Sequence, residues 1–315
     1  MFNCCVTVAA TLLLLPCLGL AEPSWPTADS SPYRAEVGSL ARTQDPGEID
    51  GALRLSLADP VVQEKAHAEA AAGESEVELA KKLSNPVASL ISVPLQFNFD
   101  QGLGTKDALR ITLNVQPVIP ITLNDEWNLI VRTILPVIYQ ESLANGISSE
   151  AGLGDTVQSF FFSPKDPTAD GWIWAVGPVF LWPTATDDLL GADKWGAGPT
   201  ALLLKQQHGW TYGALANHIW SFAGDDDRQY VNATFLQPFV SYTWPTATTL
   251  TVNTESTFDW NAGEWTIPLN VAVAQLMKIG NQRVQFAIGG KWFIESPALG
   301  ADWGIRFTVT FLFPK

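Results

Sequence analysis

The sequence predicts an all-β protein: a transmembrane antiparallel up-and-down β-barrel of about twelve strands, preceded by a short N-terminal helical segment. Between residues 94 and 313, apolar and polar residues alternate with a period of two, in about twelve segments of roughly ten residues separated by turn residues. Aromatic residues gather near the ends of these segments, and charges within them lie mostly on the polar face. A water-soluble β-sandwich would instead give shorter strands with their polar residues outward.

The first residues predict export. Residues 6–20 form an apolar run, and Gly19 and Ala21 make a small-residue cleavage signature, so we expect residues 1–21 to be a signal peptide. A membrane anchor is the alternative, although roughly 15 apolar residues are few for a spanning helix. All three cysteines lie in this segment, so the exported chain would contain no disulfide. Residues 22–58, rich in Pro, Ser, Asp, Glu and Gly, predict a disordered linker.

Residues 59–93 predict a short helical, plug-like segment before the barrel, which we expect to span 94–315. Asp59-Pro60 begins one expected helix, and the capping box Ser75-x-x-Glu78 begins a second over EVELAKKL. The stretch PVASLISV at 86–93 is apolar but does not alternate. Two placements stay open, because this segment could enter the barrel as a plug or lie in the periplasm.

The stretch GWIWAVGPVFLW at 171–182 predicts how one strand faces lipid. Its bulky residues, including Trp172 and Trp182, share one face, which we assign to lipid, and its slimmer residues share the other, which we assign to the lumen. Ten residues of strand measure about 34 Å. At a tilt of roughly 40° this gives about 26 Å of height, which matches the apolar band of outer-membrane barrels.

Other strands repeat this bracketing, which predicts aromatic girdles at both rims of the barrel rather than a soluble core. The expected girdle residues are Trp127, Tyr139, Trp172, Trp182, Trp210 and Trp220. Prolines inside strands need an explanation, since proline cannot donate to the ladder. We interpret Pro136, Pro178, Pro238 and Pro268 as bulges or local kinks; breaks between strands are the alternative.

Charges on the polar face predict the character of the lumen, because a charge on the lipid face costs about 2–4 kcal/mol at mid-depth. The lumen-facing candidates are Arg110, Arg132, Glu255, Arg283, Lys291 and Arg306. Asp155 is the other acidic candidate. A mildly cationic lumen would suit small carboxylates or phenolates. Alternatively, the arginines pair with Glu255 and Asp155 and lock the wall.

Composition and motifs argue against several other classes. A net charge of −14 disfavours a nucleic-acid partner. The acidic runs, such as 225–227, lack EF-hand spacing, so we expect solvated loops, no metal site and no cofactor. An outer-membrane lipid-modifying enzyme would need Ser and His on one face. His218 shares the face of Trp210 and Trp220, whereas Ser221 lies on the opposite face, so we expect no enzyme.

Several stretches resemble a known bacterial family. They include LNVQPVIPITLNDEWNLIVRTILPVIYQ, GLGDTVQSFFFSPK and GPVFLWPTATDDLLGADKWGAGPTALLLKQ. Over roughly 80–315 the chain is similar to exported proteins labelled "transporter", often mislabelled neuromedin U, and to the barrels of the MetA-pathway of phenol degradation. The resemblance implies an outer-membrane barrel of a Gram-negative bacterium. Outer-membrane lipid and the barrel-insertion machinery are the implied partners, although Pro314-Lys315 follows the aromatic Phe313 with which such barrels usually end.

The expected function is therefore an outer-membrane channel for passive uptake of small, hydrophobic or aromatic, solutes. The alternatives are a structural or adhesive barrel without an open pore and, less favoured, a lipid-modifying enzyme. The sequence carries no residue pattern that identifies one solute.

Overall fold

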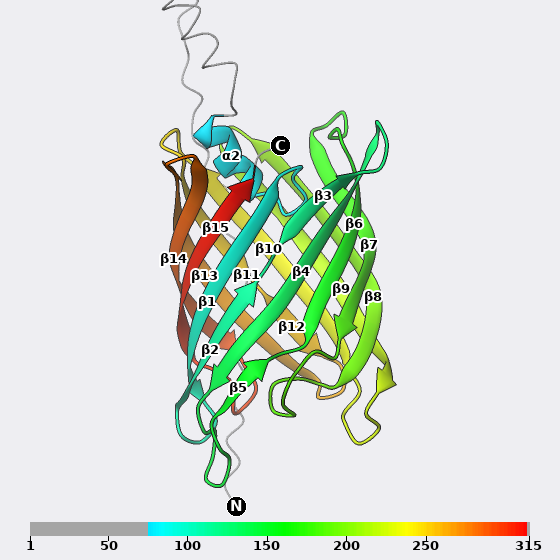
Figure 1. The fold of residues 1–315 in the computed structure, drawn as a ribbon, viewed down its shortest axis with the longest axis vertical. Helices are drawn as coiled ribbons and strands as arrows, with labels where there is room; N and C mark the ends of the chain where they lie inside the picture. The colour runs from blue at the N-terminus through cyan, green and yellow to red at the C-terminus, as the bar shows by residue number, and fades with distance from the viewer. Residues whose placement is uncertain (1–74, 314–315) are drawn as a thin grey trace, which may run out of the picture. The chain divides into compact units, whose positions relative to one another are not determined.

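The computed structural model describes residues 75–313, which form a closed antiparallel barrel with one helix, α2 (Figure 1). The strand segments are β1 (Ile91–Leu103), β2 (Ala108–Val115), β3 (Val118–Thr122), β4 (Trp127–Gln140), β5 (Glu150–Leu153), β6 (Thr156–Pro164), β7 (Trp172–Trp182), β8 (Lys194–Gln207), β9 (Trp210–Gly224), β10 (Asn232–Thr243), β11 (Thr248–Thr254), β12 (Ser256–Asp259), β13 (Glu264–Ile279), β14 (Gln282–Glu295) and β15 (Trp303–Phe313). The predicted helix at 59–74, the linker and the signal peptide lie outside the described residues.

These fifteen segments make twelve strands, because three strands are each interrupted once. The interrupted strands are β2 with β3, β5 with β6, and β11 with β12; in each case both pieces pair with the same neighbouring strand. Each strand pairs with the next, and β1 closes the ring on β15 from Ile91↔Phe313 to Gln101↔Trp303. The predicted twelve-strand barrel is confirmed.

Two of the four strand prolines fit the interpretation as bulges or local kinks. The β13–β14 register shifts at Pro268, and the pairing of β4 with β6 and β5 shifts by one residue across Pro136, from Ile134↔Val157 to Val137↔Leu153. Pro136, Pro178 and Pro238 each stay in register with one neighbour, as in Asn114↔Pro136, Pro178↔Pro199 and Pro238↔Ala214. On the other edge of the strand, toward the second neighbour, the backbone pairing is interrupted at each of these three prolines. A residue without an N–H fits at such a gap without leaving the strand.

Two glycines allow neighbouring backbones to approach closely where the pairing is interrupted, between β6 and β7 and between β8 and β9. A Cβ on Gly177 would lie 1.8 Å from the carbonyl oxygen of Phe160, and one on Gly198 would lie 1.7 Å from that of His218. No side chain fits at such distances. This part of the wall therefore requires glycine at 177 and 198.

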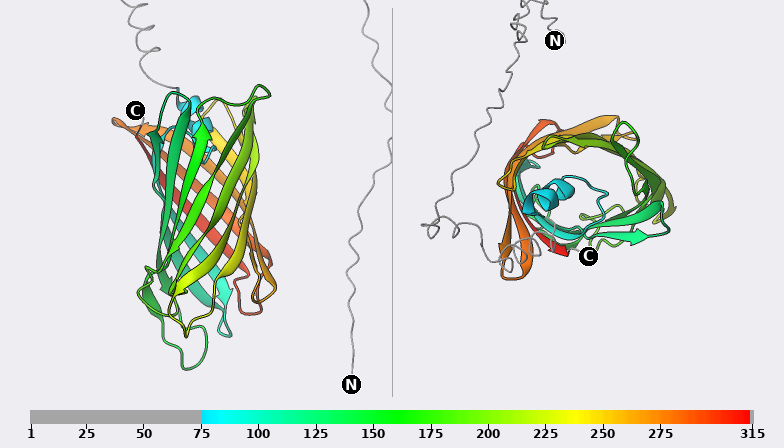
Figure 2. Two further views of the ribbon diagram at one scale, coloured as in Figure 1. Left: turned by 90° about the vertical axis from the view of Figure 1, so that its right-hand side faces the viewer. Right: turned by 90° about the horizontal axis from the view of Figure 1, so that it is seen from above.

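The helix α2 (Glu76–Leu83) lies within one end of the ring (Figure 2). Ser75 is its N-cap, with Oγ accepting from the Glu78 N–H at 3.2 Å, as the capping box predicts. Leu79 and Ala80 are buried against the wall residues Leu276 and Leu312. Gln206 Nε2 also donates to the carbonyl of Lys81 at 2.8 Å, so α2 is held by both apolar and polar contacts.

The two ends of the barrel differ. At the end that holds α2 the turns are short, such as 208–209 and 280–281, whereas the opposite end carries the longer loops 141–149 and 183–193. The helix α2 therefore lies at the end with the short turns. Among residues 75–313, no helix is long and apolar enough to cross a bilayer.

Candidate functional site

The interior wall divides into two arcs of neighbouring strands. We call β13, β14, β15, β1 and β2 the polar arc, because their inward residues are mainly amides, hydroxyls and charges. We call β4, β6, β7, β8 and β9 the apolar arc, because they supply the large buried aliphatic and aromatic residues of the lumen. The strand of β11 and β12, which bears Glu255, adjoins the polar arc at β13.

Two ion pairs lie inside the polar arc. Arg306 binds Glu255 through both guanidinium ends, with Nη1–Oε1 at 2.8 Å and Nη2–Oε2 at 2.7 Å, and its Nε donates to Asn98 at 2.7 Å. Lys291 Nζ contacts both carboxylate oxygens of Asp100 at 2.8 and 3.0 Å. These pairs join strands far apart in the sequence, so they lock this side of the wall.

Arg132 stands on β4, where the two arcs meet. One of its guanidinium nitrogens donates to Gln116 Oε1 at 3.2 Å, and Gln116 in turn donates to Gln96 at 3.3 Å. Within residues 75–313 no carboxylate forms a salt bridge with Arg132. The chain of hydrogen bonds then continues through Gln96 to Asn98, which Arg306 also contacts.

The remaining candidates lie nearer the two ends. Arg110 donates to Gln140 Oε1 through Nε at 2.7 Å, toward the long-loop end. Arg283 lies at the α2 end, in register with Leu312, and its buried Nε has no partner among the described residues. These three arginines are thus separated in space. Arg110 lies toward the long-loop end, Arg283 lies at the α2 end, and Arg132 lies where the two arcs meet.

Asp155 does not pair with any arginine in the described part of the chain. Its carboxylate accepts from the backbone N–H groups of Ala185 at 3.1 Å and Ala192 at 2.6 Å, so it fixes the loop 183–193. Asp100, which sequence reasoning missed, takes the place expected of Asp155 by pairing with Lys291. The alternation Gln96, Asn98, Asp100 against Leu95, Phe97 and Phe99 was the signal that could have found it.

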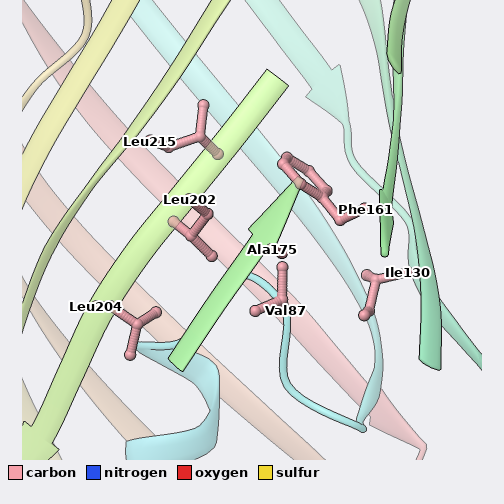
Figure 3. Packing of buried hydrophobic residues seen from close by; sticks show 7 residues of the cluster. All are labelled: Val87, Ile130, Phe161, Ala175, Leu202, Leu204 and Leu215. Atoms are coloured by element: carbon pink, nitrogen blue, oxygen red, sulfur yellow. The ribbon is translucent and has the colours of Figure 1, made fainter. Parts of the chain in front are cut away.

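The apolar arc forms one buried cluster inside the barrel (Figure 3). Its members are Val87, Ile130, Phe161, Ala175, Leu202, Leu204 and Leu215, of which all but Val87 belong to the wall. Val87 comes from the segment after α2 and reaches the wall from within. Phe235 and Phe239 of β10 pack against the same cluster. The cluster is buried, so it packs the segment after α2 against the wall opposite the polar arc.

Three cavities follow one another along the lumen. The inner cavity of about 170 Å³ lies beside Lys82, Leu83 and the segment that follows α2. The central cavity of about 300 Å³ shares Gln116 and Arg132 with the inner one. The outer cavity of about 550 Å³ shares Phe235 and Glu255 with the central one, and is also lined by Asp100, Arg110 and Lys291. The shared residues mark where neighbouring cavities adjoin.

The six girdle candidates occupy the strand ends. Trp127, Trp172 and Trp210 begin strands at the α2 end, whereas Tyr139, Trp182 and Trp220 lie toward the long-loop end. Most make aromatic contacts across strands, including Trp172 with Tyr212 at 6.1 Å and Trp182 with Trp195 at 5.4 Å between ring centroids. Lys205 Nζ lies 5.8 Å from the centre of the Trp172 ring.

His218 belongs to this outward face near the long-loop end. Its Nδ1 lies 2.7 Å from Thr234 Oγ1, its Nε2 lies 3.1 Å from Asn232 Oδ1, and its ring stacks on Trp220 with centroids 4.0 Å apart. Ser221, on the other face, accepts from the backbone N–H of Val231. In the described part of the chain, no group of three or more His, Cys, Asp or Glu residues could hold a metal ion.

No protein-family model matches the sequence, and no curated protein matches it. The structure is similar to that of the COG4313 outer membrane channel from Pseudomonas putida F1, with a TM-score of 0.55, 14% identity, and coverage of 71% of this chain and 96% of that one. The outer membrane phospholipase A from Escherichia coli superposes less well, with a TM-score of 0.43, 12% identity, and coverage of 70% and 90%. The first likeness shows that the fold is that of an outer-membrane barrel.

Proposed function

We propose that this protein is an outer-membrane channel for the passive uptake of small organic solutes. One observation carries the proposal: three cavities that share lining residues run through the interior from the long-loop end to α2. A purely structural barrel of this size could fill its interior with side chains. Here the side chains leave three neighbouring cavities, whose walls differ in chemistry.

The outward face supports placement in the outer membrane of a Gram-negative bacterium. Large apolar residues such as Val176, Leu203, Ile288 and Ile305 are exposed on it, and a protein in water rarely exposes so many. Outer-membrane lipid would cover this band, and the barrel-insertion machinery would deliver it. The Pseudomonas protein of similar fold is described as an outer membrane channel, which is consistent with this proposal.

The two arcs favour solutes with an apolar body and a polar group. Amides and cations on one side of the central cavity offer hydrogen bonds, whereas apolar side chains of the apolar arc, such as Ile134, Val157 and Leu181, line the other side. Binding sites for small molecules combine these features, with a mostly apolar lining and a few placed polar groups. Hydrophobic and aromatic solutes with one polar substituent fit this description.

The helix α2 and the apolar segment after it would act as a plug at the periplasmic end. Their side chains line the inner cavity, and the burial of Leu79 and Ala80 holds the helix against the wall. A solute that reaches the inner cavity would leave when this segment moves aside.

Swelling of proteoliposomes tests the channel. Vesicles containing refolded protein should swell in iso-osmotic arabinose faster than empty vesicles. Folding is checked first, by the faster gel migration of unheated barrel. No swelling from folded protein, either intact or lacking the α2 segment, would reject the channel in favour of a structural or adhesive barrel.

One observation favours a second candidate, a lipid-facing hydrolase. His218 lies between a hydroxyl and an amide oxygen, an arrangement similar to a nucleophile, base and orienting group. Trp260 Nε1, however, donates to the same Thr234 Oγ1 at 2.8 Å, so these contacts equally satisfy a histidine in an aromatic girdle. Hydrolysis of a p-nitrophenyl acyl ester that His218→Ala abolishes would support the hydrolase, whereas unchanged arabinose swelling in this variant would fit the channel.

A further inference from the structure

The central cavity places Arg132, which forms no salt bridge within residues 75–313, beside apolar side chains. Arg132 lines this cavity together with Ile134, Val157, Leu181, Ile219 and Phe235. A guanidinium has five N–H donors. In residues 75–313, Arg132 uses its donors for a single hydrogen bond, to the neutral side chain of Gln116.

The carboxylates of this region are already engaged. Glu255 lines the same cavity, but both of its oxygens accept from Arg306. Asp100 lies farther out and is bound by Lys291 through both oxygens. Each of these two carboxylates forms its salt bridge with a cation other than Arg132. Glu255 attracts Arg132 only at longer range, so the guanidinium N–H groups of Arg132 are available to a solute.

Arg132 lies where two of the cavities adjoin. Arg132 and Gln116 line both the central and the inner cavity, so they form the boundary between them. The amides of Gln96, Asn114 and Gln237 line the central cavity too, and each can donate to an oxygen of a bound anion. Arginine also matches a carboxylate with two parallel N–H groups, which fixes the direction of a bound solute.

We propose that the central cavity is an anion-binding station for small organic monoanions with an apolar body, with the carboxylate or phenolate on Arg132 and the body against the apolar arc. This inference rests on the proposed channel function and names its solute class. The cavity of about 300 Å³ is at the small end of ligand pockets, which suits a one-ring aromatic carboxylate. A cation of the same shape meets Arg132 with like charge and passes more slowly.

The test is solute flux into proteoliposomes at pH 8, with four probes. Benzoate carries the ring and the negative charge, acetate the charge alone, benzylammonium the ring with the opposite charge, and arabinose neither. The wild type should take up benzoate by a saturable process, faster than acetate or benzylammonium at equal low concentration. Arabinose flux should rise linearly with concentration.

Arg132→Met should lower benzoate flux at low concentration about tenfold, because one charge-assisted hydrogen-bonded contact is lost. Arg132→Lys should restore part of that flux, since it keeps the charge. Arg283→Met is the matched control: it also removes a lumen arginine, but one that does not line the central cavity, so benzoate flux should not change. Arabinose flux reports folding and pore integrity in each variant.

Two results would overturn the inference while the channel stands: equal flux of benzoate and benzylammonium, or an equal loss of benzoate and arabinose flux in Arg132→Met. Absence of arabinose and benzoate flux from folded wild type would instead reject the channel and with it the inference.

Discussion

The polar arc and the apolar arc both alternate inward and outward residues along each strand, but their inward residues differ in charge. In the polar arc, cations are matched by carboxylates across strands, as in Arg306 with Glu255 and Lys291 with Asp100. In the apolar arc, inward residues such as Phe161 and Leu204 are fully buried and make only apolar contact. Large apolar residues are exposed on the outward face of both arcs, such as Leu203 on β8 and Ile305 on β15, so the two arcs differ mainly in their inward residues.

The boundary between the arcs therefore says more about which solute could bind than either arc alone. Arg132 is on the first strand of the apolar arc and, among residues 75–313, its one hydrogen bond goes to Gln116 on the side of the polar arc. Apolar residues such as Val157 and Leu181 line the same cavity, and the amide chain begins at Gln116. A solute held there touches both chemistries at once.

The largest expected effect is on stability, and it distinguishes an inward from an outward residue of the apolar arc. Phe161→Ala should lower the free energy of unfolding by about 4 kcal/mol, because it removes a fully buried side chain and leaves a cavity in the cluster. The neighbouring Phe162→Ala is the control, since its outward side chain is 41% exposed and leaves no cavity. Urea unfolding from lipid vesicles, followed by tryptophan fluorescence, gives both values. Equal losses would show that the inward cluster is not a packed core.

A slightly smaller effect should follow from breaking an ion pair of the polar arc. Glu255→Gln should cost about 3 kcal/mol, because it leaves the largely buried Arg306 without its carboxylate. The double variant Glu255→Gln with Arg306→Gln should recover much of that loss. If the single variant unfolds like the wild type, the pair does not lock the wall. The reversal potential in a salt gradient should also shift toward anions in the single variant.

The contact of α2 with the wall predicts an effect on conductance. Leu79→Asp should weaken docking of the helix by about 2 kcal/mol, because it places a carboxylate among Leu276 and Leu312. Single-channel conductance should then rise toward that of a variant lacking residues 22–92. Glu76→Gln, in the exposed first turn of α2, should leave it unchanged. A truncated form that conducts no better than the wild type would show that α2 does not obstruct the pore.

The smallest expected effect concerns the outward face, which both arcs share. Lys205→Met should cost about 0.5–1 kcal/mol, since it removes the cation above the Trp172 ring. The measurement is the same urea titration. Flux of benzoate and arabinose should not change, because Lys205 does not line any of the three cavities described above. A change in flux would show that solutes do not pass through these three cavities.

The period of two was enough to predict the barrel, its approximate strand number and the face of most inward residues. The strand around Glu255 shows why: Thr251, Asn253, Glu255 and Thr257 stay on one face even though the ladder is interrupted between β11 and β12. Helix α2 could also be predicted from the sequence, because a capping box involves only four consecutive residues.

Pairing across the lumen was not accessible from the sequence. Lys291 and Asp100 are separated by 191 positions, and only barrel closure and strand stagger bring them together. The same holds for Asp155, whose partners are loop amides that alternation does not report. That Arg132 would lack a carboxylate could be seen only after every other carboxylate of the lumen had been assigned.

Single-channel recording in a planar bilayer tests the central claim most directly. The protein without its predicted signal peptide is refolded and recorded in a salt gradient, with benzoate then added on the long-loop side. The account predicts discrete, anion-preferring current steps that benzoate blocks transiently in the wild type but not in Arg132→Met. Folded protein that stays silent even without residues 22–92, or steps that prefer cations and ignore benzoate, would contradict it.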